Sequence, residues 1–135
     1  MKKMRAAVVG YGNIGKYVLE ALEVAPDFEV AGIVRRASSL GEKNTTGYEV
    51  VGSLEELKDV DVAIICTPSR LVEQSAKKAL ELGIPTVDSF DIHTEIYGVR
   101  SRLDEVAKAH GVAAILSAGW DPGSDSIVRA LLEVC

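Results

Sequence analysis

Short apolar runs alternate with amphipathic stretches along most of the chain. The first run, Arg5–Val9, is rich in alanine and valine and predicts a buried strand. The next stretch, Lys16–Ala25, carries apolar residues at helical spacing and is followed by Pro26 and Asp27, so it predicts a helix that ends there. The apolar runs that predict further strands are Phe28–Val34, Asp61–Thr67, Ile84–Val87 and Val112–Ser117.

Helical stretches separate these predicted strands. Ser53 and Glu56 have the spacing of a capping box, which predicts a short helix that ends near Lys58. Because strands alternate with helices, the connections require right-handed crossovers, and the strands must lie parallel. We therefore predict an α/β fold, a doubly wound parallel sheet in a single domain. The other predicted helices are Arg70–Leu82, ended by Gly83; Glu95–His110, ended by Gly111; and Ser126–Val134.

Three glycines, Gly10, Gly12 and Gly15, lie between the first predicted strand and the first predicted helix. A G-x-G-x-x-G pattern at this place in a βαβ unit is typical of Rossmann-type dinucleotide binding. The first glycine permits a tight turn, the second admits the pyrophosphate, and the third lets the helix pack closely on the strand. Free N–H groups at the helix start then hold the phosphates, and we expect Asn13 and Ile14 of the loop to contact the cofactor as well. The alternative is a glycine-rich turn without a ligand.

Two arginines, Arg35 and Arg36, lie at the end of the second predicted strand. Rossmann domains that bind NAD usually have an acid about 20 residues past the glycine loop, where it accepts a hydrogen bond from the ribose 2′-OH. Guanidinium groups instead bind a 2′-phosphate through paired charge-assisted hydrogen bonds. We therefore predict NADP as the cofactor. The alternative is a pair of solvated arginines at a strand end.

Thr67, Pro68 and Ser69 follow a predicted strand at its carboxyl end, the edge at which open α/β sheets bind ligands. We expect them to line the cofactor cleft. Ordinary helix initiation by Ser69 explains the same residues equally well, and both explanations can hold.

Acidic residues follow the last two predicted strands. Asp88 and Asp91 belong to the stretch VDSFDIH, and Trp120 and Asp121 belong to SAGWDPG. A dinucleotide is polyanionic, so acids at these places are better suited to a cationic group on a substrate. Trp120, the only tryptophan, either packs in the core or walls the pocket. Asp91 and His93 lack a third ligand nearby, so we predict no metal site and treat His93 as structural.

Composition narrows the possible functions. The chain has 135 residues, of which 47% are hydrophobic and 26% charged, as is usual for a soluble globular protein. Its net charge of −5 argues against nucleic acid or an anionic membrane as a partner. No stretch approaches the roughly 18 apolar residues that span a bilayer. Cys66 and Cys135 form no disulfide framework, and we expect a reducing, cytoplasmic setting.

Several motifs of the chain resemble, in order and spacing, the amino-terminal part of meso-diaminopimelate dehydrogenase. The segments GWDPG and DSFDIH are the specific part of this resemblance, since many dehydrogenases share the glycine loop. The resemblance implies NADP-dependent oxidative deamination of meso-2,6-diaminopimelate at its D-centre, which gives L-2-amino-6-oxopimelate and ammonia in lysine biosynthesis. It also implies that Asp91 and Asp121 hold the reacting amino group and that Trp120 shapes its pocket. The matching segments are residues 10–15, 35–36, 66–69, 87–93 and 119–123.

The resemblance also predicts how the chain is organised. Members of that family continue with a substrate and dimerisation domain, which we expect to be missing from this sequence. We expect residues 1–121 to form the NADP-binding domain and residues 122–135 to start a helix leading toward the missing domain. The isolated chain would then bind NADP with little or no turnover, and the full-length enzyme would be a homodimer.

Two other functions stay open. One is a free-standing NADP(H)-binding sensor or regulatory module without catalysis, which has no evident need for the acids at Asp91 and Asp121. The other is a different oxidoreductase of similar layout, such as an imine, sugar or aspartate-semialdehyde-type reductase, against which the segment GWDPG argues.

Overall fold

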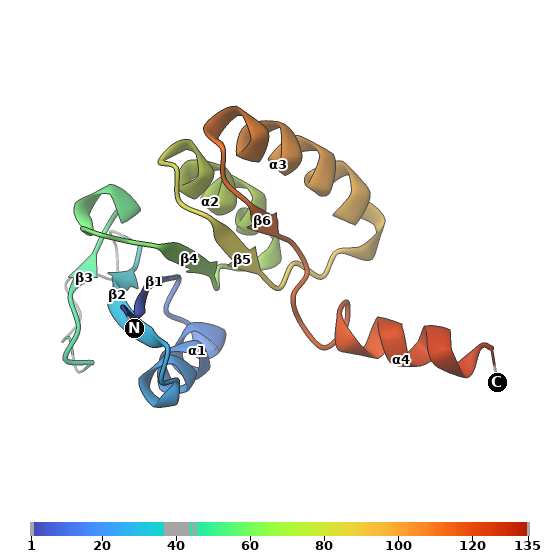
Figure 1. The fold of residues 1–135 in the computed structure, drawn as a ribbon, viewed down its shortest axis with the longest axis horizontal. Coiled ribbons are helices and arrows are strands. Elements are labelled where there is room, and N and C mark those ends of the chain that lie inside the picture. The colour runs from blue at the N-terminus through green and yellow to red at the C-terminus, as the bar shows by residue number, and fades with distance from the viewer. Residues whose placement is uncertain (1, 37–43, 45, 135) are drawn as a thin grey trace.

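The computed structural model describes residues 2–36, 44 and 46–134, which build a six-stranded sheet (Figure 1). All five strand pairings are parallel, and the strand order is β3-β2-β1-β4-β5-β6. From β1 the sheet extends through β2 to β3 on one side, and then through β4 and β5 to β6 on the other, so the strand order reverses between β1 and β4. The predicted Rossmann-type sheet is thus confirmed. The strands are β1 Met4–Val9, β2 Phe28–Val34, β3 Val50–Val51, β4 Val62–Ile65, β5 Thr86–Asp88 and β6 Ala114–Ile115.

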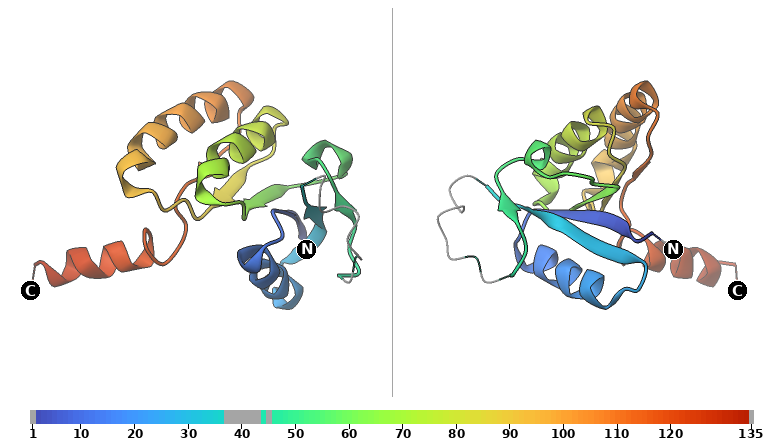
Figure 2. Two further views of the ribbon diagram at one scale, coloured as in Figure 1. Left: turned by 180° about the vertical axis from the view of Figure 1, so that it is seen from behind. Right: turned by 60° about the vertical axis from the view of Figure 1, so that its left-hand side comes forward.

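Helices cover both faces of the sheet (Figure 2). Helix α1 packs on one face, and α2 and α3 lie side by side on the other. Helix α4 follows β6 and projects away from the sheet (Figure 1). The helices are α1 Asn13–Val24, α2 Ser69–Glu81, α3 Ile96–His110 and α4 Ser124–Leu132, with short 3-10 helices η2 at Leu54–Glu56 and η3 at His93–Glu95.

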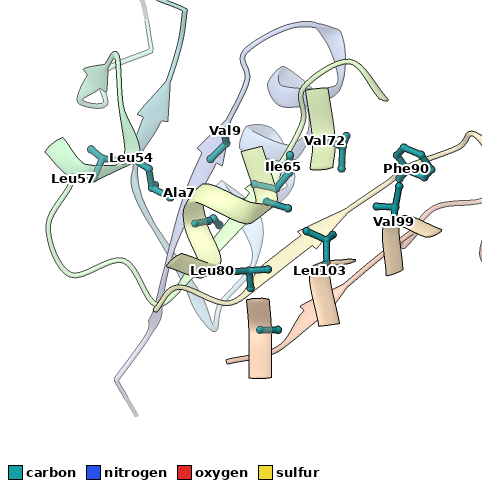
Figure 3. Close-up of a cluster of buried hydrophobic side chains, with 14 of the residues drawn as sticks. Ala7, Val9, Leu54, Leu57, Ile65, Val72, Leu80, Phe90, Val99 and Leu103 are labelled. Atoms are coloured by element: carbon teal, nitrogen blue, oxygen red, sulfur yellow. The ribbon is translucent and has the colours of Figure 1, made fainter. Parts of the chain in front are cut away.

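The hydrophobic core has two parts, one on each face of the sheet. Successive side chains of a strand point to opposite faces. On β1, Ala6 and Val8 therefore pack with Leu19 of α1, whereas Ala7 and Val9 pack beneath α2 and α3. Figure 3 shows this second cluster, with Val72 and Leu80 from α2 and Val99 and Leu103 from α3.

Strand β3 has no counterpart among the predicted strands. It is only two residues long, too short to produce a periodic signal in the sequence. Its place is fixed by pairing with β2, where the N–H of Arg35 donates to the carbonyl of Val51 at 2.9 Å. The N–H of Ile33 donates to Glu49 just before β3, also at 2.9 Å.

Helix α1 begins three residues before the predicted start. Its first residue is Asn13 rather than Lys16, so Gly15 lies within the first turn of the helix. The predicted start at Lys16 leaves this glycine just before the helix. The close approach of the helix to the preceding turn, described below, explains its place.

The predicted strands on the outer side of the sheet are too long. Strand β5 begins at Thr86 rather than Ile84, because Pro85 has no N–H and the N–H of Ile84 bonds to Ala79 at the end of α2. Strand β6 has only two residues in place of the six expected from Val112. It pairs with β5 alone, and Ser117 leaves the extended conformation at φ +61°.

Candidate dinucleotide cleft and the adjoining acidic loops

The glycine loop connects β1 to α1 and makes two close backbone contacts. Gly10 has φ +97°, and a side-chain carbon there would lie 2.8 Å from the carbonyl oxygen of Cys66. A side-chain carbon at Gly15 would lie 2.1 Å from the carbonyl oxygen of Gly10. Both contacts involve backbone atoms, which cannot give way easily. The fold itself therefore requires glycine at these two positions.

Gly12 differs from the other two glycines of the loop. A side-chain carbon at Gly12 would meet nothing within 4 Å, so the fold does not require glycine there. Gly12 is the N-cap of α1, no side chain caps this end, and the first turn has no acidic residue. The first N–H groups of a helix have no partner within the helix. Open space over these donors is the arrangement that admits an anion close to the backbone.

A cleft of about 480 Å³ lies beside this loop, at the carboxyl ends of β1 and β4 where the strand order reverses. Ligands of open α/β sheets bind at such a place. The structure brings to this cleft all of the predicted cofactor residues except Gly15, which packs behind it. The lining residues are Gly10, Tyr11, Gly12, Asn13, Ile14, Arg35, Arg36, Cys66, Thr67, Pro68, Ser69, Leu71, Ser89 and Asp91.

The two arginines are part of the lining of this cleft. Arg35 and Arg36 also line a second cavity of about 240 Å³, which extends toward Ser53 and Leu54. Sequence reasoning missed Tyr11, whose ring centroid lies 5.7 Å from the guanidinium carbon of Arg35. The signal for this contact was an aromatic residue between the first two glycines of the loop. The arrangement combines cationic side chains with an aromatic face, which suits an anionic group attached to a nucleoside.

The segment after β4 contributes both to the cleft and to α2. Thr67, Pro68 and Ser69 line the cleft as expected, whereas the N-cap of α2 is Pro68 and no side chain caps this end, so Ser69 is the first residue of the helix but does not cap it. Thr67 Oγ1 is buried and has no hydrogen-bond partner within the described chain. Burial raises the pKa of the Cys66 thiol to about 11, so this thiol stays protonated at neutral pH and is a poor nucleophile.

The structure places Asp91 in the cleft but leaves Asp121 and Trp120 outside its lining. Asp91 accepts a hydrogen bond of 2.5 Å from the hydroxyl of Ser69. Asp121 Oδ1 lies 3.0 Å from Arg129 Nη2 of α4. Trp120 is 70% exposed. The core position, one of the two roles expected for it, is therefore wrong.

His93 does not join Asp91 in a metal site. Its Nε2 lies 3.6 Å from Asp121 Oδ1, whereas Asp91 is turned toward Ser69. The described residues contain no group of three or more His, Cys, Asp or Glu side chains placed to hold a metal ion. Every helix that the structure describes is too short or too polar to cross a bilayer.

The fold and the cleft define a dinucleotide-binding domain. Residues 4–88 match the family described as "Oxidoreductase family, NAD-binding Rossmann fold", and the chain belongs to this family. A meso-diaminopimelate D-dehydrogenase of Bacteroides fragilis is 62% identical over 98% of this chain, which covers 45% of that protein. The resemblance to the amino-terminal part of this dehydrogenase is thereby confirmed. The chain spans less than half the length of this relative.

Two solved structures share the fold closely. The Corynebacterium glutamicum diaminopimelate dehydrogenase in complex with diaminopimelate superposes with a TM-score of 0.83 at 35% identity, over 97% of this chain and 41% of that one. An engineered D-amino acid dehydrogenase bound to NADP+ gives a TM-score of 0.82 at 34% identity, over 96% of this chain and 40% of that one.

Proposed function

We propose that this chain is the NADP-binding part of a dehydrogenase that oxidatively deaminates meso-2,6-diaminopimelate at its D-centre. The products are L-2-amino-6-oxopimelate and ammonia, a reaction of lysine biosynthesis. The observation that carries the proposal is that one cleft is lined both by Arg35 and Arg36 and by Asp91. Sequence identity of 62% to a meso-diaminopimelate D-dehydrogenase supports the choice of substrate.

The residues of the cleft fit NADP. The open space over Gly12 and the uncapped N–H groups of Asn13 and Ile14 suit the pyrophosphate. Arg35 and Arg36 suit the 2′-phosphate, because guanidinium groups bind phosphate oxygens in pairs. Thr67, Pro68 and Ser69 form part of the remaining wall of the cleft. When bound, NADP supplies the acceptor for the hydride that leaves the amino-bearing carbon.

The acidic residues would bind and orient the substrate. Asp91 is held by the hydroxyl of Ser69, and its carboxylate can accept hydrogen bonds from an ammonium group at the cleft. Asp121 would provide a second carboxylate for the same ammonium, and Trp120 would wall the pocket. Orientation accounts for most of the rate enhancement in such a site, because a fixed C–H direction replaces a random encounter.

The rest of the proposal concerns the whole protein. We propose that residues 1–121 form the cofactor domain, that residues 122–135 lead into a substrate domain, and that the isolated chain binds NADP with little turnover. The full-length enzyme would be a cytoplasmic homodimer without a metal, and no nucleic acid or membrane would take part in its function.

The test is a titration with NADPH and NADH, with and without diaminopimelate, on this chain and on a longer one that contains the substrate domain. We expect NADPH to bind both chains better than NADH, and only the longer chain to release ammonia from diaminopimelate. NADPH binding without turnover by the longer chain would instead support the sensor function. Equal affinities for the two coenzymes would contradict the assignment of NADP.

A further inference from the structure

Asp88 is a buried acid between the two loops that carry the proposed substrate residues. It is the last residue of β5, and only 3% of its surface is exposed. The loop after β5 continues to Asp91, and the loop after β6 continues to Trp120 and Asp121. A buried carboxylate is costly unless hydrogen bonds satisfy it, so its partners indicate its role.

The partners of Asp88 come from both loops. Its Oδ1 accepts the N–H of Phe90 at 2.9 Å and the N–H of Ser117 at 3.1 Å. Its main-chain carbonyl accepts the N–H of Ala118 at 2.7 Å. The hydroxyl of Ser117 donates to the carbonyl of Phe90 at 2.8 Å and closes the network. The loop after β5 is thus fastened to the loop after β6 by direct hydrogen bonds.

The conformation of Ser117 depends on this network. Its φ of +61° lies in the left-handed region, which non-glycine residues seldom adopt without compensating contacts. The hydrogen bonds from its N–H and its hydroxyl supply that compensation. Two residues further on, a side-chain carbon at Gly119 would lie 3.7 Å from Cβ of Ser89, so the loops also run close together there.

In the loop after β5, the network directs Asp91 toward the cleft. Phe90 is only 2% exposed and belongs to the core cluster beneath α2 and α3 (Figure 3). With its side chain buried and its N–H and carbonyl both bonded, the backbone of Phe90 is fixed. Asp91, the next residue, therefore leaves the core in a defined direction and meets the hydroxyl of Ser69.

One carboxylate oxygen of Asp88 is not used in this network. Oδ2 is buried and has no hydrogen-bond partner within the described chain. An asparagine would keep the acceptor for Phe90 and Ser117 and carry no charge. The network therefore uses Oδ1 alone, and an asparagine oxygen in the same place would serve it.

We propose that Asp88 is a positioning residue, whose Oδ1 holds the loop of Asp91 and the loop of Trp120 and Asp121 in a fixed relation beside the cleft. It acts through these residues and does not itself touch the substrate. The link between the loops follows from the geometry alone, whereas its effect on turnover rests on the proposed function.

The first test measures amide hydrogen exchange in this chain, with NMR as the readout at Phe90, Ser117 and Ala118. Asp88→Ala should speed exchange at Phe90 and Ser117 about tenfold, the effect of losing one buried hydrogen-bond partner, whereas Ala118 keeps its bond to the main-chain carbonyl of residue 88. Asp88→Asn should leave it near the unmodified rate, because the amide oxygen still accepts both N–H groups. Glu73→Gln is the control, since it weakens the ion pair with Arg102 between α2 and α3, away from the loops. Unchanged exchange in Asp88→Ala would overturn the link between the loops.

The second test measures kinetics on the longer chain that contains the substrate domain. Asp88→Ala should lower kcat/KM for diaminopimelate about a hundredfold, as a misplacement of about 1 Å can do, with the Kd for NADPH within about twofold. Asp88→Asn should restore most of the activity. Turnover that is unchanged in an Asp88→Ala enzyme with loosened loops would overturn the positioning role but not the proposed function. Lack of diaminopimelate turnover in the unmodified enzyme would overturn the proposed function, while the exchange experiment still decides the link.

A second variant covers the case in which Asp88→Ala does not fold. Ser117→Ala removes only the hydroxyl bond to the carbonyl of Phe90 and leaves Asp88 in place. We expect it to fold, to speed exchange at Phe90 and Ser117 about threefold, and to lower kcat/KM by a similar factor, since the variant loses one neutral hydrogen bond. A Ser117→Ala chain with unchanged exchange and unchanged kinetics would contradict the proposal.

Discussion

The guanidinium carbon of Arg35 lies 5.7 Å from the centre of the Tyr11 ring, so a side chain of the glycine loop meets one that follows β2 in the lining of the cleft. A ring at this distance attracts a cation through its negative face. The contact brings a guanidinium group from β2 toward the loop that suits the pyrophosphate. Tyr11 thus helps to orient Arg35, one of the two side chains to which we assign binding of the 2′-phosphate.

Replacing both arginines should remove the preference for NADPH. Arg35→Ser together with Arg36→Ser deletes two charged donors, and hydrogen bonds to charged groups contribute about 1.5–3 kcal/mol each. We expect the Kd for NADPH to rise at least about a hundredfold and the Kd for NADH to change little, as measured by calorimetric titration. Arg100→Ser, on an exposed position of α3, serves as the control. A double variant that still favours NADPH would contradict the assignment.

Removing the ring of Tyr11 should have a smaller effect in the same direction. Tyr11→Leu loses the cation–π contact, which is worth about 0.5–1 kcal/mol at an exposed site, whereas Tyr11→Phe keeps it. The ratio of the NADH and NADPH dissociation constants should therefore fall about threefold in the leucine variant and stay constant in the phenylalanine variant. Equal ratios in the two variants would show that the ring does not orient Arg35.

Gly12 and Gly15 should respond differently to alanine. At Gly15 the added carbon would lie 2.1 Å from a backbone oxygen, so Gly15→Ala should lower the midpoint of urea unfolding markedly or prevent folding. At Gly12 the added carbon meets open space, so Gly12→Ala should unfold at nearly the same urea concentration. Its methyl group would instead occupy the place of the pyrophosphate, and we expect the affinity for NADPH to fall more than about tenfold. A Gly12→Ala chain with full affinity would show that the phosphates bind elsewhere.

Asp121→Asn in the longer, substrate-binding chain should lower the rate of deamination while NADPH affinity stays nearly constant. Loss of one of the two proposed carboxylates weakens the hold on the substrate ammonium, and we expect kcat/KM to fall at least about tenfold. Asp125→Asn is a matched control, because Asp125 also pairs with Arg129 but lies within α4, one turn further on. Equal losses in the two variants would assign Asp121 to the anchoring of α4 rather than to the substrate.

The stability of the chain should depend on pH through Asp88. Burial raises the pKa of this carboxyl above its ordinary value of 3.8, against the opposing effect of hydrogen bonds from Phe90 and Ser117. The folded state therefore binds a proton more tightly than the unfolded state, and the free energy of unfolding falls as the pH rises from 3.8 through the raised pKa. Asp88→Asn removes this loss. Urea unfolding at a series of pH values above 3.8 should show the variant becoming more stable relative to the unmodified chain as the pH rises.

The sheet and the cleft could be predicted because their signals are local. The run before Gly10 and the spacing of the three glycines identify the first βα unit, and its helix needs no distant partner to be recognised. Strand β3 and the true lengths of β5 and β6 could not be predicted, because pairing with a neighbour decides them. Val50–Val51 is a strand only because β2 offers it hydrogen bonds.

The acidic loops were predicted less well than the cleft. The chemistry of Asp91 and Asp121 was visible in the sequence, but their separation was not. The first reaches the cleft and bonds Ser69, whereas the second pairs with Arg129 and lies near His93. The link through Asp88 joins residues 29 positions apart in the chain, and no periodic pattern reports such a contact.

Strand β1 forms part of both halves of the core, with Ala6 and Val8 on one side and Ala7 and Val9 on the other. Neither helical layer can detach without exposing one face of this strand to water. Opening fluctuations should therefore spare β1 until the whole domain unfolds, and its amides should be among the slowest to exchange. The loop that begins at Gly10 is attached directly to this rigid strand. The surface that meets the coenzyme would therefore be formed before the coenzyme binds.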